Sequence, residues 1–257
     1  MKDITVIIPV HEYNDVVKNL LANAIKSVPS DTKVLISANV SAVDGIKADF
    51  KEENIETISN GSTIFCQLVN DAVEKIDTKW FTILEFDDTY TKIWFDEVEK
   101  YINYKPNVSV FMPLEEIHDF NDDTFIGYGN ESVWASSFSS EIGYIDNECL
   151  QNFFDFYLTG SVFNTDDWKS NGGLKPSIKL TFWYEFLLRM THNGKKVYVI
   201  PRVGYKHMLN RENSLIKIYT ETIDSKESEG WINIAKQEYF FKKDRNKKYE
   251  PISEDED

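Results

Sequence analysis

ITVIIPVHEYNDVVKNLLANAIKSVP, residues 4–29, reads as a buried strand followed by an amphipathic helix. The run 4–10 is continuously apolar and mostly β-branched, which is typical of a strand covered on both faces of a parallel sheet. Asn14 is placed to cap the helix, apolar residues recur at spacings of three and four from Val16 to Val28, and Pro29 ends it. A strand followed by a crossover helix is the unit from which parallel sheets are built.

The same alternation of strand and helix continues through the first hundred residues. We expect further strands at 33–38, 54–58, 80–86 and 107–113, and helices at 44–51, from Ser62 or Thr63 to Ile76, and at 92–104. Because parallel neighbours need crossover connections, this order predicts an α/β protein with a parallel, doubly wound sheet.

The regular alternation stops after Pro113. Residues 115–147 are rich in Asp, Asn, Ser and Gly, which predicts insertion loops. The elements expected beyond them are a periodic stretch at 148–158, a helix at 181–193 closed by Gly194, a strand at 197–200 and a helix from about 235.

Composition indicates an acidic globular protein. The chain has 257 residues, 42% of them apolar, and its 43 acidic residues outnumber 28 Lys and Arg, for a formal net charge of −15. This apolar content excludes disorder throughout the chain, and the charge disfavours bulk nucleic-acid binding. Two cysteines are too few for a disulfide framework, and no run reaches the ~20 apolar residues of a membrane span. We therefore expect a cytoplasmic protein without a membrane span.

Polar residues follow each expected strand, at the edge where ligands bind in open parallel sheets. The sharpest set is EFDD, residues 85–88, which brings two or three carboxylates together after a buried strand. These groups would repel one another unless a cation joined them, and oxygen ligands of this kind suit Mg²⁺ or Mn²⁺. The alternative interpretation is a solvated turn.

Five segments, in order, resemble the family 2 glycosyltransferases of the GT-A fold. They are ITVIIPVHEYND at 4–15, SNGSTIFCQLVNDAVEKI at 59–76, FTILEFDDTY at 81–90, TGSVFNTDDWKSNGGLKPS at 159–177 and FWYEFLLRMTHNGKKVYVIP at 182–201. The third stands for the family's Asp-x-Asp motif, with Glu85 in place of its first Asp. The resemblance covers about residues 4–215. It implies a metal-dependent, inverting hexosyl- or pentosyltransferase that uses a nucleoside diphosphate sugar and a hydroxyl acceptor.

The resemblance also implies a layout and a donor site. It suggests a GT-A-like α/β domain at 1–220, with a mixed, mainly parallel sheet flanked by helices. The nucleotide-binding half would be 1–113, the acceptor-side half 114–220, and a C-terminal helix and charged tail would occupy 221–257. Asp87 would bind the metal that bridges the two phosphates, with Asp88 assisting and Glu85 near the ribose. The other residues of the implied nucleotide-sugar site are Pro9, Val10, Glu12, Asn39, Asn70 and Phe86.

GYKHMLNRENSL, residues 204–215, concentrates cations in an otherwise anionic chain. It offers His207 as a third metal ligand, and Lys206 and Arg211 for phosphate. We expect a loop that becomes fixed when it binds the diphosphate. The alternative is a surface histidine in a basic loop.

An inverting transfer needs a general base for the acceptor hydroxyl, and here the sequence departs from the family pattern. Phe182 and Trp183 stand where the family has a Glu-Asp pair. The nearest carboxylate is Glu185, whose alternative role is a helical salt bridge to Arg189. The other candidate bases, which could instead cap a helix, are Asp166 and Asp167.

Two other functions fit parts of the sequence. A catalytically degenerate nucleotide-sugar or saccharide binding protein on the same fold would explain Glu85 and the missing Glu-Asp pair. A nucleotidyltransferase would carry a glycine-rich basic loop after the first strand, and HEYNDVVKN at 11–19 has no glycine. The acceptor stays open among a glycan, a lipid-linked sugar, a protein and a modified nucleic-acid base.

Overall fold

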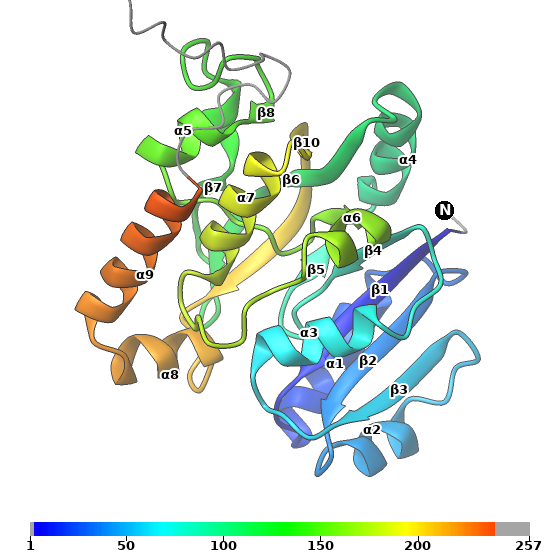
Figure 1. Cartoon of the computed structure of the whole chain (residues 1–257). Coiled ribbons are helices and arrows are strands. Elements are labelled where there is room, and N and C mark those ends of the chain that lie inside the picture. Colours follow the sequence, from blue (N-terminus) through cyan, green and yellow to red (C-terminus); the bar gives the residue numbers. More distant parts are fainter. Residues whose placement is uncertain (1–2, 240–257) are drawn as a thin grey trace, which may run out of the picture.

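A ten-stranded mixed sheet organises residues 3–239, the part of the chain that the computed structural model describes (Figure 1). The strand order is β3-β2-β1-β4-β9-β6-β10-β5, with β7 paired to β6 and β8 paired to β10. The strands are β1 (Ile4–Val10), β2 (Lys33–Asn39), β3 (Ile55–Asn60), β4 (Trp80–Ile83), β5 (Thr89–Tyr90), β6 (Val108–Asp119), β7 (Phe125–Gly129), β8 (Tyr144–Ile145), β9 (Val162–Asn164) and β10 (Lys196–Leu209). The predicted α/β class with a mixed, helix-flanked sheet is confirmed.

Helices cover both faces of this sheet. They are α1 (Asp15–Lys26), α2 (Val43–Asp49), α3 (Phe65–Val73), α4 (Trp94–Tyr104), α5 (Asn147–Asn152), α6 (Thr165–Ser170), α7 (Phe182–His192), α8 (Leu215–Thr222) and α9 (Ser225–Glu238), with a 3₁₀ turn at Glu131–Trp134. One core packs the sheet against α3 and α7, and the other packs it against α1, α2 and α4. Ile7 of β1 belongs to the first core and Ile8 to the second, as alternation along a strand requires.

The first half folds as the alternation predicts. β1 lies parallel to both β2 and β4, and β3 lies parallel to β2. Asn14 caps α1, because its side chain accepts hydrogen bonds from the N–H groups of Val16 and Val17, each at 3.0 Å. These crossovers bring the ends of β1 and β4 to the same edge of the sheet.

The second half contains more strand than expected. Residues 115–147 are not only loops, because β6 continues to Asp119 and a hairpin returns as β7. The periodic stretch at 148–158 is helical only to Asn152. β9 enters the sheet antiparallel to both β4 and β6, so it joins the parallel part to the later strands.

The expected strand at 197–200 is much longer, and residues 204–209 are not a loop. β10 runs from Lys196 to Leu209, parallel to β6 throughout. Pro201 lies where the register with β6 shifts, between Val199 and Val203. Proline is tolerated there because the irregular ladder does not need its missing N–H. His207 is therefore a strand residue.

The end of the described chain forms a helix that packs on α7. α9 begins at Ser225, earlier than expected, and Ala235 of α9 and Tyr239, directly after it, join the core that contains α7. The expected charged tail after about Lys242 lies outside the described residues. No helix within residues 3–239 has the length and apolar character needed to cross a membrane.

Candidate functional site

The turn that follows β4 carries the acidic residues. β4 ends at Ile83, three residues earlier than expected, and the Asp88 N–H donates to the Glu85 carbonyl (3.1 Å), so residues 85–88 form a tight turn. The Glu85 N–H donates to the Tyr205 hydroxyl of β10 (3.1 Å). The turn is therefore attached to β10 at the edge of the sheet where the parallel strands end.

Asp88 is buried against His207 of β10. His207 Nδ1 lies 2.9 Å from Asp88 Oδ2, and the Met208 N–H donates to Asp88 Oδ1 at 2.7 Å. Burial alone would lower the pKa of His207, but the Asp88 carboxylate outweighs it and raises that pKa to about 10. His207 is therefore a cation at neutral pH, and its ion pair with Asp88 joins the turn to β10.

Asp87 is bound by Arg211, which follows β10. Arg211 Nε lies 2.5 Å from Asp87 Oδ2, and the two side chains are only 8% and 7% exposed. Arg211 Nη1 lies 3.6 Å from Glu12 Oε1, and the guanidinium carbon lies 4.8 Å from the centroid of the Phe86 ring. Arg211 thus links the segments that follow β1, β4 and β10 through charge and cation–π contacts.

Two more carboxyl groups lie beside these pairs, one partly buried and one fully buried. Burial, reinforced by the negative charges of Asp88 and Asp87, raises the pKa of Glu85 to about 8. Burial also raises the pKa of Glu115, a fully buried residue of β6, well above its ordinary value. We call the set formed by Glu85, Asp87, Asp88, Glu115, His207 and Arg211 the acidic cluster.

A histidine directly after β1 borders the acidic cluster. The ring of His11 lies 5.5 Å from the ring of Phe86, centroid to centroid. Burial, and then the positive charge of Arg211, lowers the pKa of His11 to about 4. His11 is therefore a neutral imidazole at neutral pH, able to accept or donate a hydrogen bond without adding charge.

The chemistry of the acidic cluster fits a divalent cation at Asp87 and Glu85. Both offer carboxylate oxygens, and burial, followed by the negative charge of Asp88, raises the pKa of each, which a cation would reverse. Asp88 and His207 bind each other here, so a metal ion would have to displace the proton that they share, and their role as metal ligands stays a prediction. Within residues 3–239, no three or more His, Cys, Asp or Glu side chains are arranged to hold a metal. Mg²⁺ commonly uses one or two carboxylates together with substrate phosphates, and such a site at Asp87 stays a prediction.

Other residues of the implied nucleotide site have structural partners. Pro9 and Val10 are buried in β1 and pair with β2. Asn39, at the end of β2, donates to a backbone carbonyl ahead of α3 (3.3 Å). Lys206 does not reach the acidic cluster, because its ammonium group pairs with Asp123 in the hairpin between β6 and β7.

Asn70 fixes the glycine loop between α6 and α7. Its Nδ2 donates to the Leu174 carbonyl (2.7 Å), and the Leu174 N–H donates back to its Oδ1 (2.9 Å). Gly173 has a φ of +62°, and a Cβ there would lie 2.5 Å from Asn70 Oδ1. Asn70 was expected to face the nucleotide. In the structure its side chain makes hydrogen bonds to the backbone of this loop.

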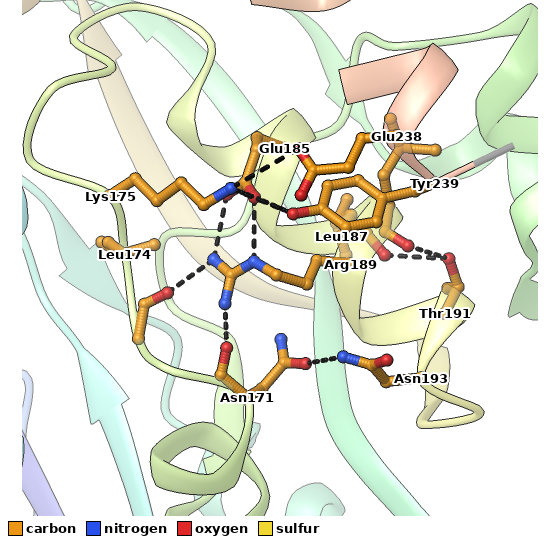
Figure 2. A network of polar contacts seen from close by, with 12 residues as sticks. Asn171, Leu174, Lys175, Glu185, Leu187, Arg189, Thr191, Asn193, Glu238 and Tyr239 are labelled. Atoms are coloured by element: carbon orange, nitrogen blue, oxygen red, sulfur yellow. Dashed lines mark hydrogen bonds and ion pairs between the residues drawn. The ribbon is translucent and has the colours of Figure 1, made fainter. Parts of the chain in front are cut away.

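Glu185 is the centre of a buried polar network (Figure 2). Its carboxylate accepts from Arg189 Nε (2.8 Å) and Nη2 (2.9 Å), and from the Tyr239 hydroxyl (3.1 Å). Lys175 Nζ lies 2.9 Å from the same carboxylate. Although burial would raise the pKa of Glu185, the hydrogen bonds from Arg189 outweigh it and lower that pKa. The helical salt bridge weighed as the alternative to a catalytic role is confirmed.

Arg189 extends this network to the glycine loop. Its guanidinium donates to the carbonyl of Asn171 and to that of Gly173 (2.7 Å), as Figure 2 shows for its contacts below Glu185. The loop is thus held by Arg189 on one side and by Asn70 on the other. No contact joins the Glu185 carboxylate to the acidic cluster among the hydrogen bonds and ion pairs of residues 3–239.

The two other candidate bases lie in the first turn of α6. Asn164 caps this helix by accepting from the Asp167 N–H (3.0 Å), so neither aspartate is the cap itself. Asp167 is paired with the Lys195 ammonium group. Asp166 is exposed and, among the described residues, has no hydrogen-bond or ion-pair partner through its side chain.

Three residues that lie in or beside the acidic cluster were not predicted from the sequence. His11 stood in a polar run after the first strand, where only its neighbour was singled out. Glu115 follows Pro113, where the strand was expected to end, and Tyr205 belongs to the segment that was expected to be a loop. Glu115 and Tyr205 would have been found if the expected strands had been extended to the observed ends of β6 and β10.

Comparison with known proteins supports the fold. No family model and no curated protein matches the sequence. The chain is similar to the crystal structure of S. aureus TarS 1-349 in complex with UDP-GlcNAc, with a TM-score of 0.67 and 13% identity over 93% of this chain and 66% of that one. TarS 1-349 in complex with UDP matches with a TM-score of 0.59 and 12% identity over 93% of this chain and 80% of that one.

This chain therefore spans about two thirds of the length of the first of these structures. At 12–13% identity, the similarity shows a shared fold. The GT-A-like architecture expected from the sequence is confirmed, whereas membership of family 2 stays a prediction.

Proposed function

We propose that this protein transfers a sugar from a nucleoside diphosphate sugar to a hydroxyl acceptor. The observation that carries the proposal is the turn at 85–88, which presents Asp87 beside Arg211 at the carboxyl edge of the sheet. Open α/β sheets bind nucleotides at this edge. A neighbour with the same fold, TarS 1-349, was crystallised with UDP-GlcNAc, which supports a donor of this class.

The acidic cluster has parts suited to a diphosphate. Mg²⁺ or Mn²⁺ held by Asp87, with Glu85 close by, would neutralise the charge that develops on the leaving diphosphate. The Arg211 guanidinium can bind two phosphate oxygens at once, and Phe86 supports its plane. The ion pair between Asp88 and His207 holds the turn in position, so that Asp87 keeps its place while the sugar bond breaks.

We propose an inverting transfer, which needs a base near the acceptor. Glu185 and Asp167 are bound to cations of the protein, which leaves Asp166 as the candidate base with an exposed carboxylate. Asp166→Asn should then lower turnover by about 10²- to 10⁴-fold and leave donor affinity unchanged. Full turnover in this variant would remove Asp166 from consideration.

A second candidate is a binding protein that has lost catalysis. It is favoured by the surroundings of Trp183, which stands in place of the family's acidic pair and packs among Phe65, Phe163 and Phe182. Donor hydrolysis or transfer measured with purified protein separates the two functions. A protein that binds UDP-GlcNAc and cleaves none over many hours would support this second candidate.

Calorimetric titration with UDP-GlcNAc, with and without Mn²⁺, tests the proposed donor site. We expect binding that depends on Mn²⁺ and that Asp87→Asn weakens by at least about tenfold, since a charged contact to the cation is lost. Asp31→Asn is the matched control, because Asp31 is exposed and precedes β2, at the opposite edge of the sheet from the end of β4. A panel of other nucleoside diphosphate sugars identifies the preferred base and sugar. If no member of the panel binds, with or without Mn²⁺, the proposed function is wrong.

A further inference from the structure

Arg211 is bound to the carboxylate of Asp87, on which the proposed cation site depends. Its Nε lies 2.5 Å from Asp87 Oδ2, inside an environment that leaves the arginine side chain 8% exposed. The same guanidinium faces Glu12 (3.6 Å) and lies over Phe86 (4.8 Å). One protein cation therefore faces two carboxylates and an aromatic ring, and it has little access to water.

The backbone around Arg211 is shaped to keep it there. Arg211 lies between Asn210 and Asn213, whose φ angles of 65° and 63° are in the left-handed region, where asparagine is among the few residues tolerated. The Asn210 side chain donates to Asp119 Oδ2 (2.6 Å), and Ser214 caps α8 through the Lys217 N–H (3.2 Å). The short arch from β10 to α8 is thus anchored at both ends, and it points Arg211 at Asp87.

We infer that Arg211 competes with a divalent cation for Asp87, so that cation and nucleotide must bind together. Two cations at one carboxylate repel each other, and Asp87 has its Oδ2 already engaged. A diphosphate removes the conflict, because it offers Arg211 another anionic partner and offers the cation further oxygens. The coupling with nucleotide rests on the proposed function, whereas the competition at Asp87 does not.

Binding of Mn²⁺ alone tests the competition. Mn²⁺ affinity is measured by electron paramagnetic resonance for the natural protein, for Arg211→Gln and for the double variant Asp87→Asn/Arg211→Gln. We expect Arg211→Gln to bind Mn²⁺ about 10- to 100-fold more tightly than the natural protein, a range typical of coupling between sites. The double variant should lose this gain. Unchanged Mn²⁺ affinity in Arg211→Gln overturns the inference.

Arg202→Gln is the matched control for the loss of one positive charge. Arg202 also belongs to β10, but it is exposed and its Nε lies 3.9 Å from Glu97, away from Asp87. Its Mn²⁺ affinity should stay within about twofold of the natural protein, because exposed charges interact weakly at distance. A gain equal to that of Arg211→Gln would mean a general charge effect and would overturn the inference. If Arg211→Gln unfolds, Arg211→Met, which keeps the packing on Phe86, takes its place.

Titrations with UDP measure the coupling between cation binding and nucleotide binding. In the natural protein, saturating UDP should tighten Mn²⁺ binding by at least about tenfold, and Mn²⁺ should tighten UDP binding by the same factor. Arg211→Gln should reduce this factor, because no internal cation has to be displaced, and the part that remains comes from phosphate oxygens that bind the cation directly. An undiminished factor contradicts the inference. Absence of UDP binding by every variant would contradict the proposed function instead, and the Mn²⁺ titrations would still decide the competition.

Discussion

Replacing Glu185 with glutamine tests whether this carboxylate is structural or catalytic. The side chain is 3% exposed and takes hydrogen bonds or ion pairs from Arg189, Lys175 and Tyr239 at 2.8–3.1 Å. Removing one partner of a buried ion pair costs about 3–5 kcal/mol, because the other charge is left uncompensated. Lys175 is 39% exposed and keeps water as a partner, so losing its contact with Glu185 adds little to this cost. We therefore expect Glu185→Gln to lower the free energy of unfolding by about 3 kcal/mol.

Urea unfolding at neutral pH measures this change, and donor affinity and turnover are measured on the folded fraction. Glu238→Gln is the matched control, because Glu238 also faces Lys175 but at 3.9 Å and with 54% of its side chain exposed. It should change stability by less than ~0.5 kcal/mol. A loss below ~1 kcal/mol in Glu185→Gln, together with turnover reduced by about 10²- to 10⁴-fold, would refute the structural role and make Glu185 the base.

Two further predictions concern the glycine loop and the acidic cluster. Gly173→Ala should lower the free energy of unfolding by about 2 kcal/mol in urea, because its backbone is left-handed and the added Cβ meets Asn70. Gly61→Ala is the control. Its added Cβ would have no atom within 4 Å, so the free energy of unfolding should change by less than ~0.5 kcal/mol. Because the pKa of His207 is raised from an ordinary 6.5 to about 10, its stabilising effect is complete below pH 6.5 and is lost as pH rises towards 10. The melting temperature should fall across this window, and Asp88→Asn should flatten the fall; an equal fall in that variant would contradict the assignment.

The fold was predictable where local pattern and topology agree. The strand at 4–10 and its helix needed only a buried apolar run, the cap at Asn14 and the stop at Pro29. β10 was not predictable in full, because Pro201 and Gly204 look like the end of a strand. Both are accommodated by irregular pairing with β6, which depends on a partner more than eighty residues away in the sequence.

The members of the acidic cluster were partly predictable, but their pairing was not. Position after a buried strand identified Asp87 and Asp88, and local charge identified His207 and Arg211. Which acid binds which base depends on how far β10 continues alongside β6. That length sets the position of His207 at the edge of the sheet. The contact between Asp88 and His207 was not predicted, and a metal bound by these two residues stays a prediction.

The charge balance of the acidic cluster explains why we expect a cation to bind at Asp87 in preference to Asp88. His207 neutralises Asp88, and Arg211 neutralises Asp87. Burial raises the pKa of the other two carboxyl groups, Glu85 and Glu115, and so favours their neutral forms. The cluster is therefore close to neutral without any metal, and an incoming cation must displace either a proton or a protein cation. Asp88 is bound by a side chain and a backbone N–H of the same strand, whereas the side chain bound to Asp87 is an arginine on the arch after that strand. Arg211 is thus the counter-ion that can move without breaking the sheet.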